Sequence, residues 1–95
     1  MAVLRLDRFT IDPADSKELL SRHAALVAAV KKAFPGLLGV ELAKVDDLTW
    51  IDVWRWDSLA SAQAAVADAP SIPQAGAAFS FTKGLTVEYA EVIDA

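Results

Sequence analysis

All three tryptophans of this chain lie in one short segment, residues 49–58, with the sequence TWIDVWRWDS. Aromatic and β-branched residues favour a strand, and successive side chains of a strand point to opposite faces of the sheet. The alternation places on one face Trp50, Asp52, Trp54 and Trp56, and on the other Thr49, Ile51, Val53 and Arg55. Both sets contain bulky apolar side chains, so we expect both faces of this strand to be covered. A small sheet cannot cover both of its own faces, which predicts helices on one side and a second subunit on the other.

The length of 95 residues indicates one domain, 1–95, which is large enough for a core but buries its surface incompletely. Hydrophobic residues make up 55% of the chain, and the mean hydropathy is +0.34. Both values are high for a small monomer, because small domains have the most surface to cover with polar groups. We therefore expect a homodimer.

The charge balance argues against several classes of partner. The net charge is −4 and the basic residues are scattered, so we expect no nucleic-acid partner. The chain has no cysteine and one histidine, which argues against disulfides and against a metal site built by the protein. The N-terminal segment carries charges at every second or third position, so we expect neither a signal peptide nor a membrane span. These features predict a cytoplasmic protein.

Turn and helix signals divide the chain into regular elements. Residues 3–11 alternate as a strand, and residues 16–34 carry apolar side chains at the spacing of an amphipathic helix that ends at Pro35-Gly36. Residues 37–45 predict a second strand, with a bulge or a close approach at Gly39, before the tryptophan strand.

The second half of the chain adds two helices and a strand. Ser58 is a typical N-cap for an alanine-rich helix over residues 59–69, and a short helix follows to about Phe79. Residues 85–93 alternate again as the last strand. This order predicts an α+β fold of the ferredoxin-like split βαβ type, with a four-stranded antiparallel sheet and helices on one face. Pairing of the other face with a second copy would form a dimeric α/β barrel.

The element order and two short passages resemble the antibiotic biosynthesis monooxygenase family of dimeric α/β-barrel proteins. The passages are PGLLG at residues 35–39 and WRWDS at residues 54–58, which leads into the alanine-rich helix. The resemblance covers nearly the whole chain. It implies that two ferredoxin-like subunits pack sheet against sheet, and that each subunit keeps a pocket between its own sheet and helices. Trp56 matches the family's tryptophan at the end of the third strand.

Members of that family include oxygenases of aromatic polyketides that use neither metal nor flavin, haem-degrading enzymes and quinol oxygenases. The haem-degrading branch implies an asparagine on the first strand and a histidine near the second helical region, whereas this chain has no asparagine and no histidine beyond His23. The resemblance therefore implies a cofactor-independent monooxygenase that acts on an aromatic, polyketide-like or quinol-like small molecule.

His23 lies on the apolar stripe of the first helix, the face expected to look toward the sheet and the pocket. A histidine there can act as a general base, because histidine titrates near neutral pH. The alternative is a core histidine that bonds a backbone carbonyl. We predict that His23 removes a proton from the substrate, and that Trp56 and Arg55 help to hold the resulting anion.

Aromatic and apolar residues supply the remaining candidate contacts. Trp50, Trp54 and Trp56 would form a wall for a flat ligand. Val27 lies on the same helix stripe as His23, and Phe79 and Phe81 would close the pocket. The alternative for each is ordinary packing in the core or in the dimer interface.

Asp52 and Arg55 are charged residues within a strand that is expected to be covered, so each needs a partner. One interpretation is an ion-pair network between strands or across the dimer. The other is that Asp52 or Arg55 turns into the pocket to hold a phenolate or to carry a proton. Two other classes of function remain open: a non-catalytic small-molecule-binding subunit, and a structural dimer whose pocket its own side chains fill.

Overall fold

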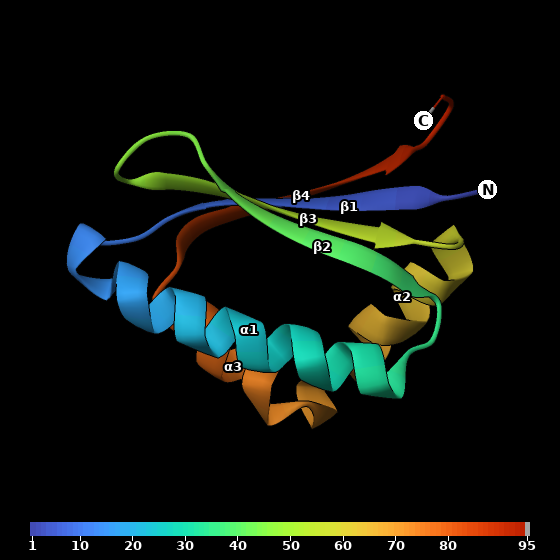
Figure 1. Ribbon diagram of the computed structural model, residues 1–95, viewed down its shortest axis with the longest axis horizontal. Helices are drawn as coiled ribbons and strands as arrows, with labels where there is room; N and C mark the ends of the chain where they lie inside the picture. Colours follow the sequence, from blue (N-terminus) through green and yellow to red (C-terminus); the bar gives the residue numbers. More distant parts are fainter. Residues whose placement is uncertain (95) are drawn as a thin grey trace.

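The sheet and helices of the computed structural model form two layers, described over residues 1–94 (Figure 1). The elements in chain order are β1 (Val3–Thr10), the 3-10 turn η1 (Pro13–Asp15), α1 (Ser16–Ala33), β2 (Leu37–Lys44), β3 (Thr49–Trp56), α2 (Leu59–Asp68), the 3-10 turn η2 (Ala69–Ser71), α3 (Pro73–Phe79) and β4 (Lys83–Glu91). The strands pair antiparallel in the order β2-β3-β1-β4. The predicted α+β ferredoxin-like arrangement is confirmed, whereas the dimeric barrel stays a prediction.

Local signals in the sequence set where the helices begin and end. The Asp12 side chain accepts a hydrogen bond from the Ala14 backbone N–H and caps η1, which leads directly into α1. Phe34 is already extended, as expected of a residue before a proline, and so α1 ends there. The Ser58 side chain accepts from the Ser61 backbone N–H at 3.1 Å and caps α2 as predicted.

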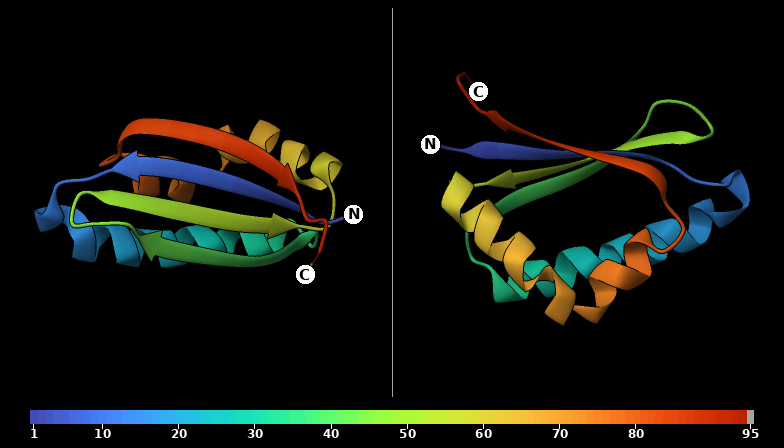
Figure 2. Two further views of the ribbon diagram at one scale, coloured as in Figure 1. Left: turned by 90° about the horizontal axis from the view of Figure 1, so that it is seen from above. Right: turned by 180° about the vertical axis from the view of Figure 1, so that it is seen from behind.

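All helices lie on one side of the sheet (Figure 2). The helix-facing side of β3 is buried and consists of Trp50, Asp52, Trp54 and Trp56. The opposite side of β3 is half-buried along its whole length. We expected both faces of β3 to be covered. Within residues 1–94, only the helix-facing side is fully buried.

Two packed clusters make up the core. The larger one joins α1, α2 and α3 to Trp54 and Trp56, and the smaller one joins Phe9, Ile11 and Leu19 to Trp50. The three tryptophans of β3 thus divide between two clusters, which separates Trp50 from its two neighbours on the same face.

The strand boundaries differ from the sequence pattern at the edges of the sheet. The register of β2 against β3 shifts between Leu37 and Gly39, which confirms the predicted bulge. β4 begins at Lys83 and ends at Glu91, two residues earlier at each end than predicted, because backbone pairing with β1 begins at Thr10. Every residue of β4 is exposed.

None of the helices within residues 1–94 combines the length and the apolarity that a bilayer crossing requires. The cytoplasmic location stays a prediction.

Candidate functional site

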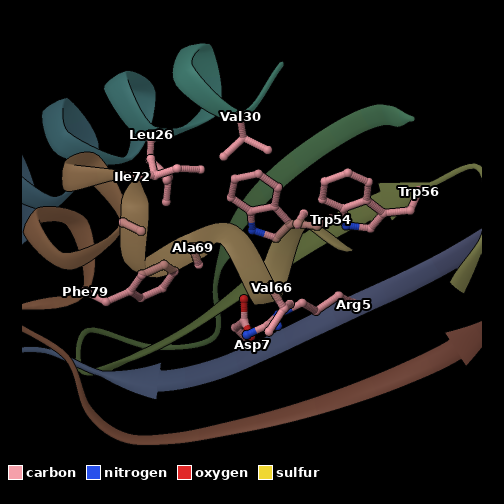
Figure 3. Close-up of a pocket in the computed structure, with 12 residues that line it drawn as sticks. Arg5, Asp7, Leu26, Val30, Trp54, Trp56, Val66, Ala69, Ile72 and Phe79 are labelled. Carbon is pink, nitrogen blue, oxygen red and sulfur yellow. The ribbon is translucent and has the colours of Figure 1, made fainter. Parts of the chain in front are cut away.

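A cavity of about 120 Å³ lies between the helices and the inner face of the sheet (Figure 3). Its walls are mostly apolar and come from α1, β3, α2, η2 and α3: Leu26, Val30, Trp54, Trp56, Ala65, Val66, Ala69, Ile72, Ala75 and Phe79. Two polar residues of β1, Arg5 and Asp7, complete the lining. Pockets that enclose drug-sized ligands measure roughly 300–1,000 Å³, so this cavity suits a molecule of one or two rings.

Arg5 and Asp7 form an ion pair at the β1 wall of the cavity. Arg5 Nε donates to Asp7 Oδ1 at 3.1 Å, and Arg5 Nη1 donates to the Tyr89 hydroxyl at 3.1 Å. Burial raises the pKa of Asp7 above its ordinary value; the Arg5 charge and hydrogen bond oppose this, and the Asp52 charge adds to it. The carboxyl of Asp7 therefore keeps its proton to a higher pH than an exposed aspartate does.

The indole nitrogens of Trp54 and Trp56 differ in their bonding. Trp54 Nε1 donates to Asp52 Oδ2 at 2.7 Å. Trp56 Nε1 is buried and has no hydrogen-bond partner among residues 1–94. Figure 3 shows both nitrogens on the ring edges nearest to β1. Trp56 thus contributes to the cavity wall a ring whose N–H is a buried donor without a partner in residues 1–94.

His23 is buried behind this wall. Its Nε2 lies 2.9 Å from Asp52 Oδ1, and its ring meets the Trp54 ring edge-on, with 6.0 Å between centroids. An ionised Asp52 can only accept, so Nε2 carries the hydrogen of this pair. His23 does not line the cavity. The partner of His23 is a carboxylate, not the backbone carbonyl of the alternative interpretation.

The other predicted site residues fall in different places. Phe79 lines the cavity and packs edge-on against Phe9, whereas Val27 packs against the larger core cluster outside the lining. Phe81 lies under the Arg22 guanidinium and packs against the smaller cluster. Arg55 lies on the outer face of the sheet, opposite Leu4 of β1, and does not reach the cavity.

Sequence reasoning missed Arg5 and Asp7 as cavity residues. The alternation of β1 places them on one face with Val3 and Phe9, and this signal was readable. The register that sets Asp7 directly opposite Asp52 was not readable from the sequence.

The residues present do not fit a haem. The cavity lining, as described over residues 1–94, contains no histidine, cysteine, methionine or tyrosine, which are the usual axial ligands of haem iron. Within the same residues, no group of three or more His, Cys, Asp or Glu side chains is placed to hold a metal ion.

No protein-family model matches the sequence, and no curated protein matches it. Solved structures do match, and they show that the chain has the fold of the antibiotic biosynthesis monooxygenases, as the resemblance implied. A Caulobacter crescentus protein, provisionally assigned as such a monooxygenase, has a TM-score of 0.78 and 18% identity, over 98% of this chain and 91% of that one.

Two further neighbours have named activities. SnoaB, a cofactor-independent oxygenase from Streptomyces nogalater, has a TM-score of 0.74 and 20% identity, over 99% of this chain and 95% of its own. The haem degrader MhuD from Mycobacterium tuberculosis, whose structure holds two haems in its active site, has a TM-score of 0.72 and 25% identity, over 98% and 97%. These likenesses establish the fold, on which different chemistries occur.

Proposed function

We propose that this chain is a monooxygenase-like protein that oxidises a small, electron-rich aromatic molecule without a cofactor. The observation that carries the proposal is the cavity itself, because two tryptophans, Phe79 and aliphatic side chains line a space that has polar groups on one side only. A flat ring buried there gains from apolar contact and from edge or offset stacking on the indoles. The fold shared with SnoaB supports this class of reaction.

The reaction requires deprotonation followed by attack on dioxygen. For a substrate with an activated ring CH₂, both C–H bonds of that CH₂ break, a C=O bond forms and one water molecule leaves. The substrate supplies all the electrons that reduce dioxygen, so no other reductant enters. The Trp56 N–H, which is buried and has no partner within residues 1–94, would donate a hydrogen bond to the oxygen of the substrate anion and so stabilise its charge.

The predicted roles of His23 and Arg55 change in this proposal. His23 can act on the cavity only through Asp52 and the Trp54 ring, so we assign it the positioning of Trp54. Arg55 lies on the outer face of the sheet, and we assign it no role at the cavity.

Oxygen uptake tests the proposal. Metal-stripped protein is assayed against one- and two-ring quinols, with Trp56→Phe beside Trp50→Phe. Both tryptophans lie on the same face of β3, and each buries an unpartnered N–H, but Trp50 does not line the cavity. We expect uptake that Trp56→Phe lowers by roughly ten-fold or more, as for the loss of an oxyanion donor, and that Trp50→Phe keeps. Equal loss in both variants, or no uptake with any substrate, would contradict the proposal.

A non-catalytic binding protein is the second candidate, and the placement of His23 favours it. The His23 ring, which the sequence analysis predicted to be the base, is bonded to Asp52 and does not line the cavity. Tight binding of quinols without oxygen uptake would select this function. The presence of the cavity beside α1 disfavours the third candidate, a structural dimer with a filled pocket.

We also propose that the outer face of the sheet binds a second copy of this chain. Its centre is apolar and half-buried, with Leu4 and Leu6 of β1 beside Ile51 and Val53 of β3. Around this centre lie two arginines and two glutamates, whose opposite charges can pair across a two-fold axis: Arg8, Arg55, Glu41 and Glu88. We expect sedimentation to show a dimer that Val53→Glu dissociates and that Val66→Glu, on the helix side, leaves intact. A monomeric wild-type chain would contradict this.

A further inference from the structure

Asp7 presents an unusual carboxyl group, almost wholly buried yet part of a cavity wall. Asp7 is 2% exposed and lines the cavity. Arg5 Nε donates to Oδ1, and within residues 1–94 no hydrogen bond to Oδ2 is present. Figure 3 shows a carboxyl oxygen of Asp7 pointing from β1 toward the aromatic side of the cavity. One oxygen of Asp7 is therefore available to a ligand.

The charges around Asp7 favour a neutral ligand over an anion. Arg5 is its direct partner on β1, and Asp52 lies directly opposite it on β3, where His23 of α1 bonds the Asp52 carboxylate. On β4, Tyr89 accepts a hydrogen bond from Arg5, and Val87 lies opposite Asp7. The lining contributed by α2, η2 and α3 is apolar. A bound anion would add a further negative charge beside two buried carboxylates, at a high cost.

We propose that Asp7 accepts a hydrogen bond from the acidic O–H or C–H of the substrate and takes that proton in turnover, so that the site selects neutral hydroxyaromatic molecules over their anions. The inference rests on the proposed function and names both its substrate class and its base.

The proton transfer leaves the net charge of the site unchanged. The O–H or C–H bond of the substrate breaks, its electron pair stays on the substrate, and an O–H bond forms at Asp7 Oδ2. The loss of charge on Asp7 leaves the Arg5 cation next to the new anion, which stabilises it. At a ring CH₂, the carbanion then forms a C–O bond to dioxygen, after which the O–O bond and the second C–H bond break. The Asp7 proton and the second ring hydrogen leave with the other oxygen atom as one water molecule. A base whose pKa is raised by burial is better matched to this task than an exposed aspartate.

Binding of 4-nitrophenol tests the inference without turnover, because its neutral and ionised forms differ in colour. Its methyl ether, 4-nitroanisole, has no proton to donate and serves as the ligand control. The variant is Asp7→Asn, and the matched control is Asp47→Asn, which removes the same charge from an exposed aspartate that pairs with Lys44.

We expect the wild-type protein and Asp47→Asn to bind 4-nitrophenol roughly ten-fold tighter than 4-nitroanisole, as for one hydrogen bond to a charged group. Binding should raise the pKa of the bound 4-nitrophenol in both proteins. Asp7→Asn should lose the preference over 4-nitroanisole and should lower the pKa of the bound phenol, because the anion then lies beside an unpaired Arg5. If Asp7→Asn does not fold, the test uses the wild-type protein alone. Its preference for 4-nitrophenol over 4-nitroanisole should then fall as the pH drops through the pKa of Asp7.

Equal binding of both ligands to the wild-type protein, or the same shift in Asp7→Asn, would overturn the role of Asp7 and leave aromatic binding intact. Binding of neither ligand would overturn the proposed function together with the inference. Oxygen uptake that survives in Asp7→Asn would reject Asp7 as the base while the monooxygenase function stands.

Discussion

His23 of α1 and Asp52 of β3 are joined by a buried contact of 2.9 Å between Nε2 and Oδ1. The second oxygen of Asp52 accepts the Trp54 N–H at 2.7 Å, so one carboxylate fixes both the long helix and the cavity wall. Asp52 is wholly buried, and a buried carboxylate needs such partners. The pair therefore helps to hold the Trp54 ring in place at the cavity wall.

Replacing His23 with alanine should lower the free energy of unfolding by roughly 3 kcal/mol, because it leaves the buried Asp52 carboxylate without one partner. Chemical denaturation measures the change. Lys17→Ala, on the exposed side of the same helix, should change stability by about 0.5 kcal/mol or less. Equal effects of the two substitutions would show that the contact contributes nothing.

Asp7 should make stability depend on pH in a defined direction. Its pKa in the folded state is raised above that of the unfolded chain, so the folded state binds more protons between these two values. The free energy of unfolding contributed by Asp7 is therefore highest in acid, and it falls as the pH rises from the unfolded pKa through the folded one. Asp7→Asn should remove this fall. The free energy of unfolding of Asp7→Asn minus that of the wild type should therefore be larger at neutral pH than in acid. Parallel stability curves for the two proteins would contradict the raised pKa.

Gly36 and Gly76 should respond oppositely to replacement by alanine. A Cβ at Gly36 would lie 2.9 Å from Ser61 Cβ and 2.8 Å from Ser61 Oγ, where the chain leaves α1 and passes α2. Such overpacking costs roughly 1–3 kcal/mol. A Cβ at Gly76, within α3, meets nothing within 4 Å, so Gly76→Ala should stabilise by roughly 0.5–1 kcal/mol. Thermal unfolding of both variants checks the sign, and a stabilised Gly36→Ala would show that α2 moves away freely.

Much of the fold was readable from the sequence because its signals are local. The alternation of Trp50, Asp52 and Trp54 correctly set one face of β3, and Gly39 marked the bulge in β2. The start of β4 at Lys83 was missed, since backbone pairing with β1 extends the strand through residues that carry no apolar alternation. Burial on both faces of β3 depends on a second chain, which stays a prediction.

The candidate site was harder to predict, because it depends on which residues meet across strands and helices. The sequence analysis grouped Trp54, Trp56 and Phe79 around a pocket, and these three residues line one cavity, while their contact with a ligand stays a prediction. Arg55 and Trp56 are neighbours in β3, so their side chains point to opposite faces of the sheet. The alternation in the sequence therefore already placed these two residues apart. The position of Asp7 opposite Asp52 depends on the register between β1 and β3, which the sequence does not show.

The central claim is that the cavity binds a small aromatic molecule. A binding titration with 1,4-dihydroxynaphthalene, monitored by tryptophan fluorescence, tests it most directly. The test variant is Ala69→Phe, which places a ring in the cavity, and the control is Ala67→Phe, on the exposed side of α2. We predict saturable quenching in the wild-type protein and in Ala67→Phe, and its loss in Ala69→Phe. Quenching that persists unchanged in Ala69→Phe would place the ligand elsewhere and would contradict the account.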